Sequence, residues 1–172
     1  TGPSALKCTG DVYNKMIPEN VDMTQKVLNN KINEYYDFMT HYTYGTKVTD
    51  TIKNKDPKRI PKIIKDNFSN SVIIVDEAQH LRSKNSKGEK PGHEAIDLIS
   101  KHAENVRIVF LTATPMFDNP TEIIWMINVL IRVNRDNIPE LDEKDIFHGE
   151  SNGYLFKDSG SDKFIRAIRG KI

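Results

Sequence analysis

The sequence predicts an α/β fold in which helices flank a parallel sheet. Two short apolar runs, residues 72–75 and 106–111, each end abruptly in polar residues, as a buried strand does at the edge of a sheet. Between them, residues 93–103 repeat apolar side chains at helical spacing. A strand, a helix and a second strand at this spacing form a crossover unit, which predicts parallel strands and a right-handed connection.

Length and composition set the bounds on this fold. The chain has 172 residues, enough for one domain with a core. Its 25 Lys and Arg residues nearly balance its 24 Asp and Glu residues, so net charge argues neither for nor against nucleic acid. A single cysteine excludes an internal disulfide and suits a reducing, intracellular setting, and no apolar run is long enough to cross a membrane. The chain starts without methionine, and we expect an internal piece of a longer protein.

The first third of the chain has weaker signals. Residues 21–33 predict a helix, although many asparagines weaken it. The aromatic segment 35–40 predicts a strand that ends in a turn near Gly45. A further helix is expected from about Pro57, because apolar residues between 60 and 68 fall on one face.

The remaining elements are punctuated by proline, glycine and polar residues. A polar loop at 82–90 and a Pro91-Gly92 turn are expected to precede the central helix. The last strongly marked helix is expected to be capped by Asn119, with Pro120 at its first position, and to be apolar nearly all round. Residues 135–160 are polar and predicted to be irregular. A final helix is expected at 161–169, with its apolar face formed by three residues: Phe164, Ile165 and Ile168.

The polar residues that follow the two predicted strands are the candidate functional site. Asp76 and Glu77 follow the first strand, and Thr112 and Thr114 follow the second. Ligands of open α/β sheets are held where strands end, and an acidic pair there is a common device for a magnesium ion and an activated water. An ordinary acidic loop is the alternative.

Two motifs make the resemblance specific. Asp76-Glu77-Ala78-Gln79 is similar to motif II of the superfamily 2 helicases, with Gln79 where many members have histidine. Glutamine can donate and accept hydrogen bonds, so linkage to the next motif remains possible. Thr112-Ala113-Thr114-Pro115 resembles motif III. His80-Leu81-Arg82 and the stretch 115–130 resemble the Swi/Snf-type branch, and within it the helicase-like nucleoside triphosphatases of large DNA viruses.

This resemblance implies a fold, a chemistry and partners. Residues 1–172 would form an incomplete first RecA-like domain, with the best-matched core at 34–131 and a less closely matched extension at 132–172. The implied cofactors are ATP and Mg²⁺, and the implied partners are DNA, with RNA possible, and a second RecA-like lobe of the same protein. The implied setting is viral transcription or replication in the host cytoplasm or nucleus, or the virion.

The resemblance also assigns roles to residues. Asp76 would orient magnesium, and Glu77 would act as the general base. Gln79, Thr112 and Thr114 would couple hydrolysis to the grip on nucleic acid. The positions that match nucleic-acid contacts in the family are Ser4 and Thr40.

The phosphate-binding loop of such enzymes is missing from this sequence. No stretch of these 172 residues reads G-x-x-x-x-G-K-[ST], and they contain no second lobe with an arginine finger. We therefore expect the chain by itself not to hydrolyse ATP. Two alternatives remain: a non-catalytic RecA-like binding module, and a fragment of an AAA-type ATPase. The Thr-Ala-Thr-Pro strand end and the helix after it argue against the second.

Overall fold

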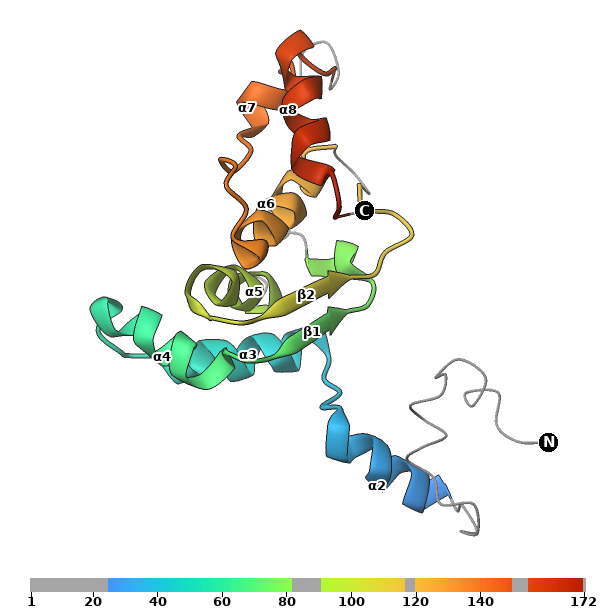
Figure 1. Ribbon diagram of the computed structural model, residues 1–172. Helices are drawn as coiled ribbons and strands as arrows, with labels where there is room; N and C mark the ends of the chain where they lie inside the picture. Colours follow the sequence, from blue (N-terminus) through green and yellow to red (C-terminus); the bar gives the residue numbers. More distant parts are fainter. Residues whose placement is uncertain (1–24, 82–90, 117–119, 150–154, 172) are drawn as a thin grey trace, which may run out of the picture. The chain divides into compact units, whose positions relative to one another are not determined.

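The computed structural model describes residues 25–81, 91–116, 120–149 and 155–171, which form the helices and strands of Figure 1. The chain divides into two compact units, Thr1–Met39 and Thr40–Ile172. In chain order the elements are α2 (Gln25–Tyr35), α3 (His41–Ile52), η2 (Pro57–Arg59), α4 (Ile60–Phe68), β1 (Val72–Val75), η3 (Ala78–Leu81), α5 (Pro91–His102), β2 (Arg107–Phe110), α6 (Glu122–Asn134), α7 (Glu143–Ile146) and α8 (Asp158–Ile168).

In the first unit, the described residues contain the helix α2. It confirms the helix expected at 21–33 over the part that the structure describes and continues to Tyr35. After it, the rings of Tyr36 and Phe38 lie 6.0 Å apart, and both side chains are exposed.

The strand predicted at 35–40 is wrong, because this segment joins two helices. Thr40 is the N-cap of α3, and its hydroxyl accepts a hydrogen bond from the backbone N–H of Thr43 at 3.1 Å. The capping hydroxyl outweighs the β-propensity of the preceding aromatic residues. The turn expected near Gly45 is also wrong, since Gly45 is buried within α3. A Cβ atom there would lie 2.2 Å from the backbone carbon of Pro91, so glycine is needed for the close approach of α3 to α5.

The central unit β1–α5–β2 confirms the predicted strand, helix and parallel strand. The four residues of β1 pair with those of β2 in parallel, with Val72 opposite Arg107 and Val75 opposite Phe110. The Pro91-Gly92 turn is wrong, because both residues lie in the first turn of α5, where proline costs no hydrogen bond. The predicted 82–90 loop lies outside the described residues.

One face of this small sheet is packed and the other is bare among the described residues. Val75 and Ile108 are less than 10% exposed and join the main core with side chains from α3, α4, α5 and α6. Side chains alternate along each strand, so the opposite face carries Val72, Ile74 and Val109, which are 68%, 58% and 43% exposed. Parallel sheets in proteins are normally covered on both faces.

Helix α6 connects the central unit to the C-terminal helices. As predicted, it is apolar nearly all round: Met126 and Val129 join the main core, Ile123 and Ile127 join a second cluster, and Ile124 joins a third. The predicted start is wrong, because α6 begins at Glu122 with Thr121 at the N-cap. Pro120 precedes the helix, and Asn119 lies outside the described residues.

The C-terminal region contains more structure than the sequence predicts. Within the stretch expected to be irregular, α7 forms, and Phe147 pairs with Phe156 in an antiparallel bridge. Helix α8 begins at Asp158, three residues earlier than expected, and Phe164 packs into the apolar clusters as predicted. Ile165 does not, since it is 50% exposed.

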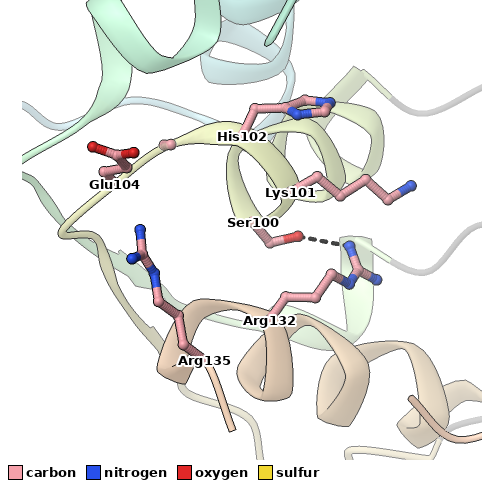
Figure 2. A pocket seen from close by; sticks show the side chains of 7 residues that line it. Ser100, Lys101, His102, Glu104, Arg132 and Arg135 are labelled. Carbon is pink, nitrogen blue, oxygen red and sulfur yellow. Dashed lines mark hydrogen bonds between the residues drawn. The ribbon is translucent and has the colours of Figure 1, made fainter. Parts of the chain in front are cut away.

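A partly buried ion-pair network joins α5 to α6. The Arg132 guanidinium donates to Asp97 Oδ1 at 2.7 Å. It also donates to Ser100 Oγ at 2.7 Å (Figure 2). Asp97 also accepts from Lys101 at 2.6 Å. Partial burial by itself raises the pKa of Asp97, but hydrogen bonds from Lys101 and Arg132 and their positive charges outweigh it and hold the pKa below its ordinary value.

This network predicts how stability responds to acid. Because the pKa of Asp97 is lower in the folded chain, its contribution is fully present above the unfolded pKa of about 4 and is lost as the pH falls through the folded pKa. We expect Asp97→Asn to lower the free energy of unfolding at pH 7 and to flatten its decline below pH 4. Urea unfolding at several pH values measures this. An Asp66→Asn control on the exposed face of α4 should keep the wild-type decline, and an equally steep decline in Asp97→Asn would contradict the prediction.

Candidate functional site

The ends of β1 and β2 lie at the same edge of the sheet and are tied together by backbone hydrogen bonds. Leu111, which follows β2, donates its N–H to the carbonyl of Val75 at 2.8 Å. Ala78, which follows the acidic pair, donates its N–H to the carbonyl of Leu111 at 3.0 Å. These bonds fix the acidic pair beside the segment that carries Thr112.

The acid turn, Asp76–Glu77, has an unusual backbone. Glu77 has a φ of 50°, in the left-handed region that costs side chains other than glycine, asparagine and aspartate appreciable free energy. The Asp76 carboxylate accepts the N–H of Glu77 at 3.0 Å. Both side chains are exposed at the sheet edge. Left-handed residues of this kind persist where the surroundings hold them, and they are found preferentially at functional sites.

A hydrogen-bonded chain runs from the acid turn to the second strand end. Gln79 donates its amide Nε2 to Glu77 Oε2 at 2.5 Å. Its amide oxygen accepts the hydroxyl of Thr112, also at 2.5 Å, and the Thr112 hydroxyl in turn accepts the N–H of Thr114 at 3.1 Å. The amide of Gln79 is therefore fixed in orientation, with its nitrogen toward the carboxylate and its oxygen toward the hydroxyl. We call this set of bonds the Glu77–Thr112 relay.

The structure places the remaining site candidates less centrally. Thr40 is exposed, and its hydroxyl caps α3 and shares a hydrogen bond of 2.8 Å with the hydroxyl of Thr43. Ser4 lies outside the described residues. Sequence reasoning missed His41, whose Nε2 lies 2.9 Å from the backbone carbonyl of Asp76. No local pattern in the sequence indicates this contact, because it depends on the packing of α3 beside the acid turn.

The acid turn fits one part of a magnesium site. Among the described residues, no group of three or more His, Cys, Asp or Glu side chains is arranged to hold a metal ion. Magnesium in nucleotide sites is usually held by one or two carboxylates, several waters and the substrate phosphates. Asp76 and Glu77, exposed side by side, match such a minimal protein contribution.

An open pocket of about 390 Å³ elsewhere in the fold has a different character. It is lined by the last residues of α5 and α6 and by the turn after α5, including Lys101, Arg132 and Arg135 (Figure 2). Lys101 and Arg132 are engaged by Asp97. Two helix C-termini meet there, and their partial negative charges favour these cations. Asp97 and the two helix C-termini therefore account for the basic residues that line this pocket.

The chain is similar to several proteins of large DNA viruses whose names include helicase. The chain is 25% identical over 195 aligned positions, 97% of its length, to "Putative ATP-dependent RNA helicase L377" of Acanthamoeba polyphaga mimivirus. It is 34% identical over 107 residues, 62% of its length, to "Putative ATP-dependent RNA helicase R563" of the same virus. It is 26% identical over 148 residues, 86% of its length, to "Putative helicase 087L" of Invertebrate iridescent virus 3.

The predicted resemblance to helicase-like proteins of large DNA viruses is thereby confirmed. The chain spans 16% of the length of each of the two mimivirus proteins and 14% of the iridescent virus protein. No protein-family model matches the chain, and no solved structure is significantly similar to it. Among the described residues, the helices are too short or too polar to span a membrane.

Proposed function

We propose that the chain is the later part of the first RecA-like lobe of an ATP-dependent nucleic-acid translocase of superfamily 2, in the Swi/Snf-type branch. The observation that carries this proposal is the Glu77–Thr112 relay. It links a carboxylate at one strand end to a hydroxyl at the next through a single oriented amide. Such a link is what an enzyme needs if events at a phosphate are to change the position of a neighbouring segment.

The positions of the residues support the roles that the resemblance implies. When bound, magnesium would neutralise charge on the phosphates, with Asp76 orienting it directly or through its waters. Glu77 accepts the proton of the attacking water, and Gln79 holds the Glu77 carboxylate in place. A change in charge or position at Glu77 would reach Thr112 and then Thr114 through the relay. The lobe would thus alter its grip on nucleic acid as hydrolysis proceeds.

The bare sheet face supports the proposal that this lobe is incomplete within the chain. A two-stranded sheet with Val72, Ile74 and Val109 exposed leaves a sizeable apolar area in water. The relatives are also six to seven times longer than the matched region. We propose that other strands and helices of the complete polypeptide cover this face and supply the phosphate-binding loop, and that a second RecA-like lobe closes the site.

The motifs and the names of the relatives indicate different nucleic acids. The motifs resemble DNA translocases, whereas two relatives carry names that say RNA helicase. We propose DNA as the partner, bound near Ser4 and Thr40, with viral transcription or replication as the setting. A non-catalytic RecA-like module is the competing proposal, favoured by the absence of a phosphate-loop motif from the 172 residues.

Steady-state ATP hydrolysis tests these proposals. The complete polypeptide should hydrolyse ATP in the presence of Mg²⁺, and duplex DNA should stimulate the turnover more than RNA does. The 172-residue chain alone should show no turnover above the buffer blank. A complete polypeptide that binds nucleic acid and never hydrolyses ATP would support the non-catalytic module instead.

Removing the hydroxyl of Thr112 should weaken the coupling between nucleic-acid binding and ATP hydrolysis. In the complete polypeptide, we expect Thr112→Val to lower the nucleic-acid-stimulated turnover by about tenfold, because Gln79 loses the donor that orients it. The affinity for nucleic acid should change little. A Thr46→Val control, which removes a hydroxyl bonded to a backbone carbonyl within α3, should retain stimulation. Equal stimulation in Thr112→Val and wild type would contradict the coupling role.

A further inference from the structure

We propose that His41 is a positioning residue that holds the acid turn in its active geometry and ties it to the start of α3. This inference rests on the proposed function, because it assigns a regulatory contact to the same site. From the sequence, no functional role is assigned to His41. Its ring nitrogen Nε2 and the Asp76 carbonyl oxygen are 2.9 Å apart, although the two residues are 35 positions apart in the chain.

The chemistry of this contact fixes the proton. A backbone carbonyl can only accept a hydrogen bond, so Nε2 of His41 must carry hydrogen. The neutral Nε2–H tautomer and the imidazolium both meet this requirement. A side chain without a donor therefore removes the contact.

The bond acts on the one peptide unit that sets the orientation of Glu77. The carbonyl of Asp76 and the N–H of Glu77 belong to the same planar peptide. His41 holds the carbonyl side, and the Asp76 carboxylate holds the N–H side at 3.0 Å. The φ of Glu77 is rotation about the bond that leaves this plane, and its value of 50° is unfavourable for glutamate. Clamping both sides of the peptide is thus a direct way to keep Glu77 in a conformation that it would otherwise leave.

The backbone of His41 is itself held firmly. A Cβ atom at Gly92, in the first turn of α5, would lie 3.0 Å from the carbonyl oxygen of His41 and 2.7 Å from Leu81 Cδ2. A Cβ atom at Gly45, one turn further along α3, would lie still closer to the backbone of Pro91. The first turns of α3 and α5 therefore pack closely against each other and against η3. This packing leaves little space for any of the three to move independently. A displacement of the first turn of α3 would be transmitted to the carbonyl of Asp76.

Through this arrangement, nucleic acid bound at α3 would influence Glu77, the proposed general base. Thr40, the proposed nucleic-acid contact, immediately precedes His41, and Tyr42 on its other side is 69% exposed. A ligand seated on these residues would act on the first turn of α3, and His41 would pass the displacement to Glu77. The Glu77–Thr112 relay would then be the second of two connections to the acid turn.

Variants of His41 in the complete polypeptide test the inference. In glutamine, the amide nitrogen is as many bonds from Cβ as Nε2 is in histidine, so His41→Gln retains a donor of similar reach. His41→Leu keeps the bulk and removes the donor. We expect His41→Leu to lower the nucleic-acid-stimulated kcat by about tenfold while the KM for ATP stays within about twofold, because Glu77 is misplaced and binding groups are intact. His41→Gln should recover most of the loss.

Controls separate positioning from folding. His102→Leu makes the same change at a half-buried histidine in the last turn of α5 and should keep full stimulation. The thermal midpoints of His41→Leu and His41→Gln should agree, so that stability does not explain their different kcat values. Unchanged stimulation in His41→Leu, or a glutamine variant no better than leucine, would overturn the inference alone. A wild-type polypeptide without ATP turnover would overturn the proposed function, and the inference with it.

Discussion

Glu77→Gln in the complete polypeptide is expected to reduce ATP turnover by about a thousandfold, because the amide cannot accept a proton from the attacking water. The substitution leaves the rest of the site in place. The amide oxygen of the new side chain can still accept the hydrogen bond that Gln79 donates to Glu77. Nucleotide binding should therefore persist, and the variant should accumulate as an ATP-bound state.

Turnover and nucleotide affinity need to be measured together on this variant. Steady-state hydrolysis gives the loss in kcat, and equilibrium binding of a fluorescent ATP analogue gives the affinity. Glu94→Gln is the matched control, since Glu94 is an exposed glutamate in the first turn of α5. It should keep wild-type turnover. Turnover by Glu77→Gln within a few-fold of wild type would exclude Glu77 as the general base.

Gly45→Ala is expected to be the most damaging single substitution in the packed core. Alanine improves helix propensity by about 1 kcal/mol relative to glycine, which by itself would stabilise α3. The new Cβ atom, however, would lie 2.2 Å from the backbone carbon of Pro91 and 2.3 Å from the backbone nitrogen of Gly92. Backbone atoms cannot rotate away, so α3 and α5 must separate. We expect a net loss of about 3 kcal/mol in the free energy of unfolding.

Urea unfolding of the 172-residue chain measures this effect. Gly149→Ala is the matched control, because nothing lies within 4 Å of the position that its Cβ would take. Its unfolding free energy should stay within about 0.5 kcal/mol of wild type. A Gly45→Ala chain as stable as wild type would mean that α3 and α5 do not pack as closely as described.

The central unit could be predicted from the sequence because its signals are local. Four consecutive β-branched residues, Val72–Val75, followed by Asp76 predict a strand, and the mostly apolar run that contains β2 predicts a second one. The helix between them has a clear apolar face, and its length dictates parallel strands. The position of the candidate site could be predicted once these two strands were assigned, because both end at the same edge of the sheet. Their shared edge brings Glu77, Gln79 and Thr112 together.

The errors occurred where tertiary contacts decide the local structure. The segment 35–40 has high β-propensity, but the hydroxyl of Thr40 starts a helix immediately after it. Gly45 predicts a turn by its local sequence, although its role is to allow the close approach of α3 to α5. The left-handed backbone of Glu77 and its link to His41 depend on packing between residues distant in sequence. No periodicity or local motif reports such contacts.

Iron-mediated cleavage of the complete polypeptide tests most directly whether the acid turn holds the metal that binds with the nucleotide. Fe²⁺ takes oxygen ligands and can replace Mg²⁺; with ascorbate and peroxide it cuts the backbone beside its site. With ADP present, we expect cuts at residues 76–79 and beside Thr112, and their loss in Asp76→Asn. Cuts that avoid both strand ends, or that persist unchanged in Asp76→Asn, would contradict a nucleotide–metal site at this edge of the sheet.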